Sequence, residues 1–229
     1  MATYLELQQT IADELGGRQD LLAPLLGTGL TLSPVKNAIQ SAINVWEFEP
    51  FWFNEDYEQN IFNTVAGQEF YTSADWSILT TAPNLLRIHV LISGNRYPIK
   101  PRTWGYLEDT SVNPSVTGQP IDYAYLGGKF RLYPIPDGAY PLTFSLNELL
   151  SDLVNDADTN AWTTDAYDLI RSQAKLILAR EILYDDELAQ RMEVAIYGNP
   201  ALPRERGYLY ALKARTTRRA KSRIQPSYF

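Results

Sequence analysis

The sequence predicts an α+β protein in which a helical bundle, formed by helices from both ends of the chain, carries an inserted antiparallel β module. Apolar residues recur at helical spacing near the N-terminus and again after Asp152. From about Asn60, short segments rich in β-branched and aromatic residues alternate with Gly, Pro, Asn and Asp. This order, without an internal repeat, predicts that the terminal helices pack together. The predicted parts are 1–59, 60–150, 151–212 and a basic terminal arm, 213–229.

The first helix has clear start and stop signals. Thr3 followed by Glu6 forms a capping-box pattern, and Gly16-Gly17 ends the run. Residues 18–32 are expected to form a loop. Four apolar residues lie in phase: Tyr4, Leu7, Ile11 and Leu15.

A second helix is predicted to begin at Ser33-Pro34, with serine as the N-cap and proline at the first helical position. We expect it to run past Phe48 toward Phe53, although Pro50 should kink or break it. Its apolar face is formed by Val35, Ala38, Ile39, Ala42, Ile43 and Trp46.

Within the β module, the clearest signal is a hairpin. Tyr123 and Tyr125 precede the pair Gly127-Gly128, and Phe130 and Leu132 follow it. The two glycines can supply the positive φ angles that a tight turn requires.

After Asp152 the helical pattern returns. Thr164 or Asp165 is expected to cap a long helix, a second helix ends at Gly198, and Pro203 opens the last. The acids 185–187 could mimic a catalytic carboxylate pair, but they fit better as first-turn acids that favour the helix dipole.

Charge is distributed unevenly along the chain, whose formal net charge is -7. Residues 204–229 contain eight basic residues and one acid, a net charge of +7, whereas the preceding 203 residues contain 12 basic and 26 acidic residues, a net charge of -14. The basic end should be attracted to phosphate or to an acidic protein surface, and the body should repel DNA.

Several classes of function are disfavoured. The chain has no cysteine, which excludes disulfides, thiolate metal sites and a cysteine nucleophile. It shows no secretory signal and no apolar stretch long enough to span a membrane, so an intracellular setting, or a particle assembled there, is expected.

The search for an active site finds little. The single histidine, His89, lies in a strand-like apolar segment, and no catalytic or phosphate-binding motif is present. The stretch NDADTN, residues 155–160, begins like a calcium loop, but Ala161 and Tyr167 occupy the positions that need glycine and glutamate. We therefore predict no enzyme, catalytic residue, metal or cofactor.

An aromatic cluster is interleaved with acids: Trp46, Phe48, Phe51, Trp52 and Phe53. The acids argue against base stacking. These rings are expected to fill the core or to form a subunit interface, since aromatics are enriched in interface cores. A hydrolase or glycan-binding site in segment 46–58 remains an alternative.

Three stretches taken in order carry a resemblance: FYTSADW, then GQPIDYAYLGGKFRLYPIPDGAYPLTFSL, then AYDLIRSQAKLILAREILYDDELAQRMEVAIYG. They resemble the head-to-tail adaptor (connector) proteins of tailed bacteriophages, of the short-tailed type. The second stretch is the most specific, and the resemblance covers most of the chain.

The resemblance implies a structural virion protein at the portal vertex between head and tail, assembled in the host cytoplasm. Such adaptors form a ring, usually dodecameric, beneath the portal protein. The ring extends the DNA channel, through which genomic DNA passes without specific binding, and offers a platform to the tail nozzle or tail tube protein. The helical part would contact neighbouring subunits and the portal, and the C-terminal segment would embrace the portal.

The C-terminal arm is accordingly expected to dock onto the portal. Its charges would pair with portal acids and its apolar residues would anchor it, as a segment that orders on binding requires. A nucleic-acid-binding module acting through the same basic tail is the alternative. The predicted docking residues are Lys213, Arg215, Arg218, Arg219, Lys221, Arg223, Ile224, Tyr228 and Phe229, with Pro226 as a further apolar anchor.

Overall fold

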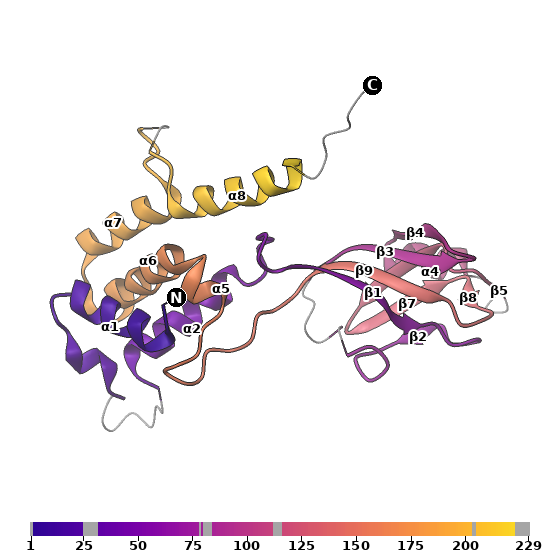
Figure 1. Cartoon of the computed structure of the whole chain (residues 1–229), viewed down its shortest axis with the longest axis horizontal. Coiled ribbons are helices and arrows are strands. Elements are labelled where there is room, and N and C mark those ends of the chain that lie inside the picture. Colours follow the sequence, from indigo (N-terminus) through magenta and orange to yellow (C-terminus); the bar gives the residue numbers. More distant parts are fainter. Residues whose placement is uncertain are drawn as a thin grey trace. The chain divides into compact units, whose positions relative to one another are not determined.

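The fold is seen in a computed structural model of the chain (Figure 1), which describes residues 2–24, 32–77, 79, 84–111, 116–202 and 205–222. The chain divides into two compact units. A helical unit comprises Met1–Phe53 and Leu150–Phe229, and a β unit comprises Asn54–Leu149. The predicted α+β class is confirmed: helices come from both ends of the chain, and the sheet is inserted between them in the sequence.

The helical unit is built from helices that precede and follow the insertion. The N-terminal part contains α1 (Tyr4–Glu14), a 3₁₀ turn η1 (Gln19–Leu22) and α2 (Pro34–Trp46). The C-terminal part contains α5 (Ala161–Thr164), α6 (Tyr167–Leu178), a π-helical turn η2 (Ala179–Leu183), α7 (Asp186–Tyr197) and α8 (Tyr208–Ser222).

Local signals set several of these boundaries as predicted. Thr3 and Glu6 form the reciprocal capping box of α1, with the Thr3 backbone N–H donating to Glu6 Oε2 at 2.8 Å. Ser33 caps α2, and its Oγ accepts from the Lys36 N–H. Asp185 caps α7 by accepting from the Leu188 N–H, which confirms the structural interpretation of the acids 185–187.

Three predicted boundaries are wrong. Helix α2 ends at Trp46 instead of reaching Phe53, because Pro50 disfavours helix in the residues before it. Thr164 and Asp165 do not cap the long helix: they end the short helix α5, whose own cap is Asn160. Helix α8 begins at Tyr208, and Pro203 lies outside the described residues.

The core of the helical unit joins the two ends of the chain. The buried face of α2 packs against α6, whose buried residues include Leu169, Ile170 and Leu178. Because this core draws on residues from both sides of the insertion, neither sequence half can bury its apolar face alone.

A carboxylate on α1 reinforces that joining of the two ends. Glu14 accepts from Lys175 Nζ at 2.6 Å and from Arg171 Nη1 at 3.0 Å, both on α6. Lys175 is buried, with 9% of its surface exposed, so its ammonium depends on Glu14 for compensation.

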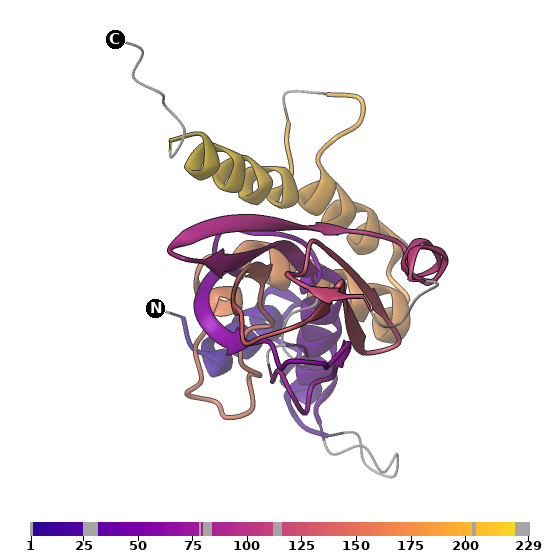
Figure 2. The same cartoon turned by 90° about the vertical axis from the view of Figure 1, so that its right-hand side faces the viewer.

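Helices α7 and α8 lie nearly end to end, and the connection between them leaves and returns at one point (Figures 1 and 2). Gly198 and Arg206 form an isolated antiparallel bridge. A Cβ at Gly207 would overlap the Ile196 carbonyl, and one at Gly198, whose φ is +92°, would meet the Glu205 carbonyl. Two glycines therefore permit the close backbone approach that lines up α8 with α7.

The β unit contains a seven-stranded sheet in the order β1-β9-β3-β4-β6-β7-β2 and a two-stranded sheet of β5 and β8. The long strands are β1 (Glu55–Asn63), β3 (Asn84–Ile92), β4 (Asn95–Pro101) and β9 (Pro141–Asn147). The others are β2 (Phe70–Tyr71), β5 (Thr117–Gly118), β6 (Asp122–Leu126), β7 (Lys129–Tyr133) and β8 (Ile135–Pro136). Helix α4 (Trp104–Thr110) belongs to the same unit.

The predicted hairpin is confirmed as β6 and β7, with Tyr125 opposite Phe130 and both turn glycines at positive φ. The sheet is not purely antiparallel: β4 and β6 pair in parallel over two residues, Lys100 with Asp122 and Pro101 with Tyr123. Trp76 lies at the centre of the core of this unit, stacked on Tyr71 with ring centroids 4.3 Å apart.

We predict that Gly207→Ala lowers the free energy of unfolding of the helical unit by about 1–3 kcal/mol, because the methyl group overpacks the α7–α8 junction. Denaturant unfolding measures the loss. The matched control is Gly105→Ala in α4, where an added Cβ meets nothing within 4 Å and should be neutral or slightly stabilising. A Gly207→Ala protein as stable as the native one would contradict the close approach.

Glu14→Ala should destabilise the chain by about 1–3 kcal/mol, because it leaves the buried Lys175 ammonium without its carboxylate. Asp20→Ala is the control, since its ion pair with Arg18 is exposed and such pairs contribute about 0–1 kcal/mol. Adding Lys175→Met to Glu14→Ala should restore part of the loss. Equal midpoints for the Glu14 and Asp20 variants in thermal unfolding would show that Glu14 does not join the two ends.

Candidate functional site

The aromatic segment divides into buried and exposed residues. Trp46 and Phe51 are buried in the core of the helical unit, and Phe51 has 0% of its surface exposed. Phe53 stacks on Phe51 at 5.2 Å and meets Trp162 edge-on at the same centroid distance. Phe48, by contrast, has 57% of its surface exposed. Trp52 and Phe53 are partly exposed.

The same segment holds helix α8 in place. Lys213 Nζ forms an ion pair with Glu49 Oε2 at 2.8 Å, and the Trp52 backbone N–H donates to Thr216 Oγ1 at 3.2 Å. Leu212, the residue immediately before Lys213 on α8, is buried. The sequence presents the aromatic–acidic segment and the basic C-terminal segment as separate features, and the structure brings them together.

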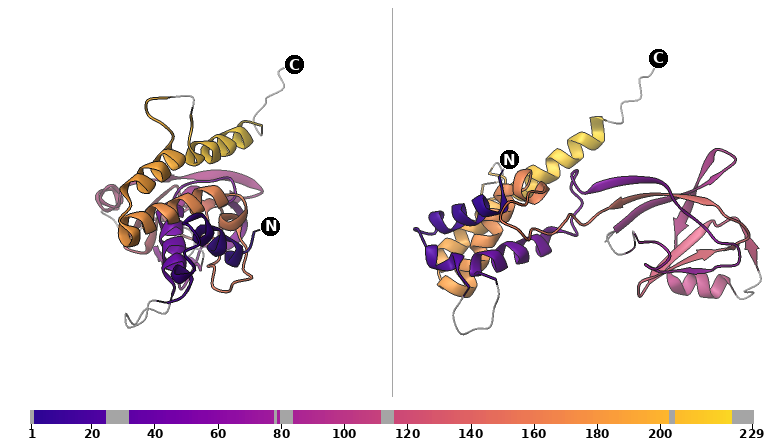
Figure 3. Two further views of the ribbon diagram at one scale, coloured as in Figure 1. Left: turned by 90° about the vertical axis from the view of Figure 1, so that its left-hand side faces the viewer. Right: turned by 60° about the horizontal axis from the view of Figure 1, so that its bottom comes forward.

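The predicted docking arm starts inside this helix. Lys213 already has a partner within the chain, whereas Arg215 and Arg218 are exposed on α8. Figure 3 shows the C-terminal part of α8 extending beyond the packed helices of its unit. Arg219 and Lys221 belong to the same helix. The remaining arm residues, Arg223, Ile224, Pro226, Tyr228 and Phe229, lie outside the described residues.

The acids of the calcium-like loop have local structural partners. Asp156 accepts from Lys36 Nζ at 2.9 Å, and this hydrogen bond, with a weaker one from Gln8, lowers the pKa of Asp156. Asp158 accepts from the Asn155 and Val154 backbone N–H groups, which lower its pKa as well. Within the described ranges, no group of three or more His, Cys, Asp or Glu side chains could hold a metal ion.

His89 lies on β3, opposite Pro98 of β4 and Thr143 of β9. Burial lowers the pKa of His89, and the nearby charges of Arg87 and Arg96 lower it further. These charged neighbours are cations, so they would oppose the imidazolium that general-base catalysis creates.

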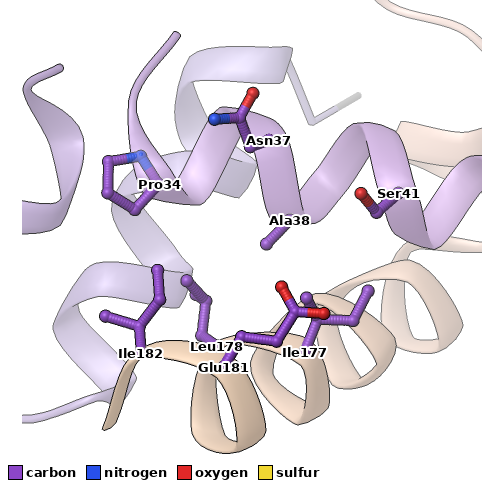
Figure 4. A pocket seen from close by; sticks show the side chains of 8 residues that line it. All are labelled: Pro34, Asn37, Ala38, Ser41, Ile177, Leu178, Glu181 and Ile182. Atoms are coloured by element: carbon purple, nitrogen blue, oxygen red, sulfur yellow. The ribbon is translucent and has the colours of Figure 1, made fainter. Parts of the chain in front are cut away.

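A hollow of about 200 Å³ lies between α2 and the end of α6 with its π-helical turn (Figure 4). Its wall is largely aliphatic, and Figure 4 shows the Glu181 carboxylate beneath Ala38. Small-molecule sites usually measure about 300–1,000 Å³ and combine several convergent polar groups. This hollow fits an apolar side chain better than a substrate. It is lined by Pro34, Asn37, Ala38, Ser41, Ile177, Leu178, Glu181 and Ile182.

The helices that the structure describes include none with the length and apolar character needed to cross a membrane. A search of curated proteins gave no match. A family model described as "SU10 adaptor protein" matches residues 2–223, which includes every helix and strand described above. The chain therefore belongs to the SU10 adaptor protein family, a family of structural adaptor proteins of bacteriophages.

Proposed function

We propose that this protein is a ring-forming head-to-tail adaptor that attaches to the portal protein at the capsid vertex and provides the platform for the tail. The observation that carries the proposal is the family match over residues 2–223, which reaches through the basic helix α8. The ring, of twelve copies, would extend the DNA channel and receive the tail nozzle or tail tube protein. Its place is in the virion, between head and tail.

The attachment to the portal would use α8 and the residues that follow it. Lys213, Leu212 and Thr216 fix the first half of α8 to its own unit. The exposed Arg215 and Arg218 are then held on a rigid helix, so little conformational entropy is lost when they pair with portal acids. The apolar residues Ile224, Tyr228 and Phe229 would supply the anchors that slow dissociation.

The contact between neighbouring copies would involve Phe48. Phe48 lies just after α2 with 57% of its surface exposed, and interface cores are enriched in aromatic rings. Trp46 and Phe51 would support this contact from inside the chain by fixing the backbone on either side of Phe48.

The charge of the body suits a channel through which DNA moves. Residues 1–203 carry a net charge of -14, so a ring of many copies would present a strongly negative surface to the duplex. Such a surface repels phosphate and would let genomic DNA pass without specific binding.

Replacing Arg215, Arg218, Arg219, Lys221 and Arg223 together by Gln should weaken attachment to portal rings at least about tenfold, since several charge-assisted pairs are lost. Removing residues 224–229 should also weaken it, through faster dissociation. Electron microscopy of the protein mixed with portal rings shows whether an additional ring forms. Circular dichroism should show an unchanged fold in both variants.

The matched control for this experiment is Lys213→Gln, which changes a charge on the same helix but removes an internal ion pair. It should keep most of the portal attachment, because Leu212 and Thr216 still hold the helix, and it should lose only about 0–1 kcal/mol of stability, as for other exposed pairs. The contrary result is a five-residue variant that attaches normally to the portal but loses a DNA affinity that, in the native protein, falls steeply with salt. That result would support a nucleic-acid-binding tail.

Phe48→Ser should reduce ring formation and lower the free energy of unfolding by only about 0.5–1 kcal/mol, because the side chain is more than half exposed. Phe51→Ala should mainly affect stability, lowering the free energy of unfolding by about 3–5 kcal/mol, because it removes a ring from the core. Thermal unfolding and particle counts on the portal separate the two effects. Native ring yield from the Phe48→Ser protein would place the subunit contact elsewhere.

A further inference from the structure

The β3–β4 hairpin carries a cationic hollow that neither the fold nor the proposed portal contact explains. Its volume is about 300 Å³. Basic and imidazole side chains share its wall with apolar ones, so an anionic group with a hydrocarbon stem would match it. The hollow is lined by Arg87, Ile88, His89, Pro98, Ile99, Lys100, Pro101 and Tyr123.

The register of the hairpin concentrates positive charge on one face. Ile88 is opposite Ile99, so Arg87 and Lys100 occupy the next positions across from each other. Side chains alternate along a strand, which places Arg87, His89 and Lys100 on the face opposite the buried Ile88 and Ile99. Like charges at such cross-strand positions destabilise a sheet.

Acidic residues are scarce in the sequence around these charges. Residues 76–107 contain no Asp or Glu, although they include four Arg or Lys residues and His89. The nearest buried acid, Asp122, is engaged by Arg102 at 3.0 Å. Among the described residues, no acid lies within ion-pair distance of Arg87 or Lys100. Burial lowers the pKa of His89, and the charge of Arg87 lowers it further, which agrees with a positive environment.

The complementary charge lies in the same unit, at the edge of the sheet. Residues 54–86 contain five acids and no Lys or Arg. Glu69 pairs with Arg131 at 2.6 Å, and Asp75 accepts from Thr72 and Gln68. Glu55 is exposed on β1, an edge strand whose outer side has no neighbour in the sheet.

A carboxylate fits the hollow better than a DNA phosphate. Pro98 is opposite His89 and therefore on the same face, where it supplies an apolar surface that can contact the methylene groups of a glutamate. The β unit as a whole has six basic and ten acidic residues, a net charge of -4, so a polyanionic duplex would be repelled overall.

We propose that the hollow binds the acidic edge strand β1 of a second copy of this chain, with the carboxylate of Glu55 entering between Arg87 and Lys100. The proposal rests on the ring-forming function and assigns one of its subunit contacts. Because the acidic and basic surfaces differ, each copy uses one surface toward each neighbour. Such a heterologous contact is the kind that generates a closed ring.

Disulfide cross-linking tests this contact. The chain contains no cysteine, so only the introduced cysteines can react. Glu55→Cys protein is mixed with Lys100→Cys protein under mild oxidation, and disulfide-linked dimers are measured by mass spectrometry. Positions 55 and 100 of one chain cannot form a disulfide with each other. Strands β9 and β3 lie between β1 and β4, which are therefore about 14 Å apart, whereas a disulfide needs Cα atoms within about 7 Å. We expect at least about tenfold more mixed dimer than from random collision.

The matched control mixes Glu55→Cys with Lys129→Cys, a cysteine at another exposed lysine of the same unit. A charge exchange adds a second measurement: Lys100→Glu should reduce ring formation, and Lys100→Glu combined with Glu55→Lys should restore part of it. Equal cross-linking at positions 100 and 129 in preparations that do form rings would overturn the hollow contact and leave the ring intact. Absence of any self-association, with or without portal, would overturn both.

Discussion

The pairing of β1 with β9 is the interaction on which the rest of the chain depends. These strands come from opposite ends of the inserted unit, and their register places Glu55 beside Asn147. The Glu148 N–H donates to the Asn54 carbonyl at 2.8 Å, immediately before the chain returns to its helices. The chain thus leaves and re-enters the helical unit at neighbouring points. This closure lets α2 and α6 share one core although more than a hundred residues separate them.

Within the helical unit, the segment after α2, residues 47–53, also holds helix α8 in place. Phe51 fixes this segment to the core, and Glu49 and the Trp52 N–H are then presented to Lys213 and Thr216. The direction of α8 is also constrained by the Gly198–Gly207 approach, which continues it from α7. A helix held at both points can present exposed arginines in a fixed direction, as a docking element of an adaptor requires.

The parts of the fold that could be predicted are those set by local chemistry. The Thr3 capping box, the Ser33 cap and the Gly127-Gly128 hairpin depend on residues a few positions apart, and all three were predicted correctly. The long-range contacts could not be predicted. The Lys213–Glu49 pair, the Glu14–Lys175 pair and the parallel β4–β6 pairing join residues that the sequence gives no reason to connect.

Long-range contacts also decide which residues of the candidate site are buried. Its aromatic residues were recognised by composition, but composition could not separate the buried Phe51 from the exposed Phe48. Had α2 continued, helical periodicity would have assigned each ring a face. The helix ends at Trp46, and after that point the tertiary structure alone decides which rings are buried.

Helix α8 and the β3–β4 hairpin, the two cationic features of this acidic chain, share one arrangement of charges. In both, one basic residue is engaged internally, Lys213 by Glu49 and Arg102 by Asp122, and further basic residues beside it remain exposed. The engaged residue fixes the element, and the exposed ones can attract a partner. Electrostatic attraction mainly accelerates association and sets orientation, whereas apolar anchors slow dissociation. An assembly that must form in one order and then persist benefits from both, because the charges orient each contact before the apolar side chains lock it.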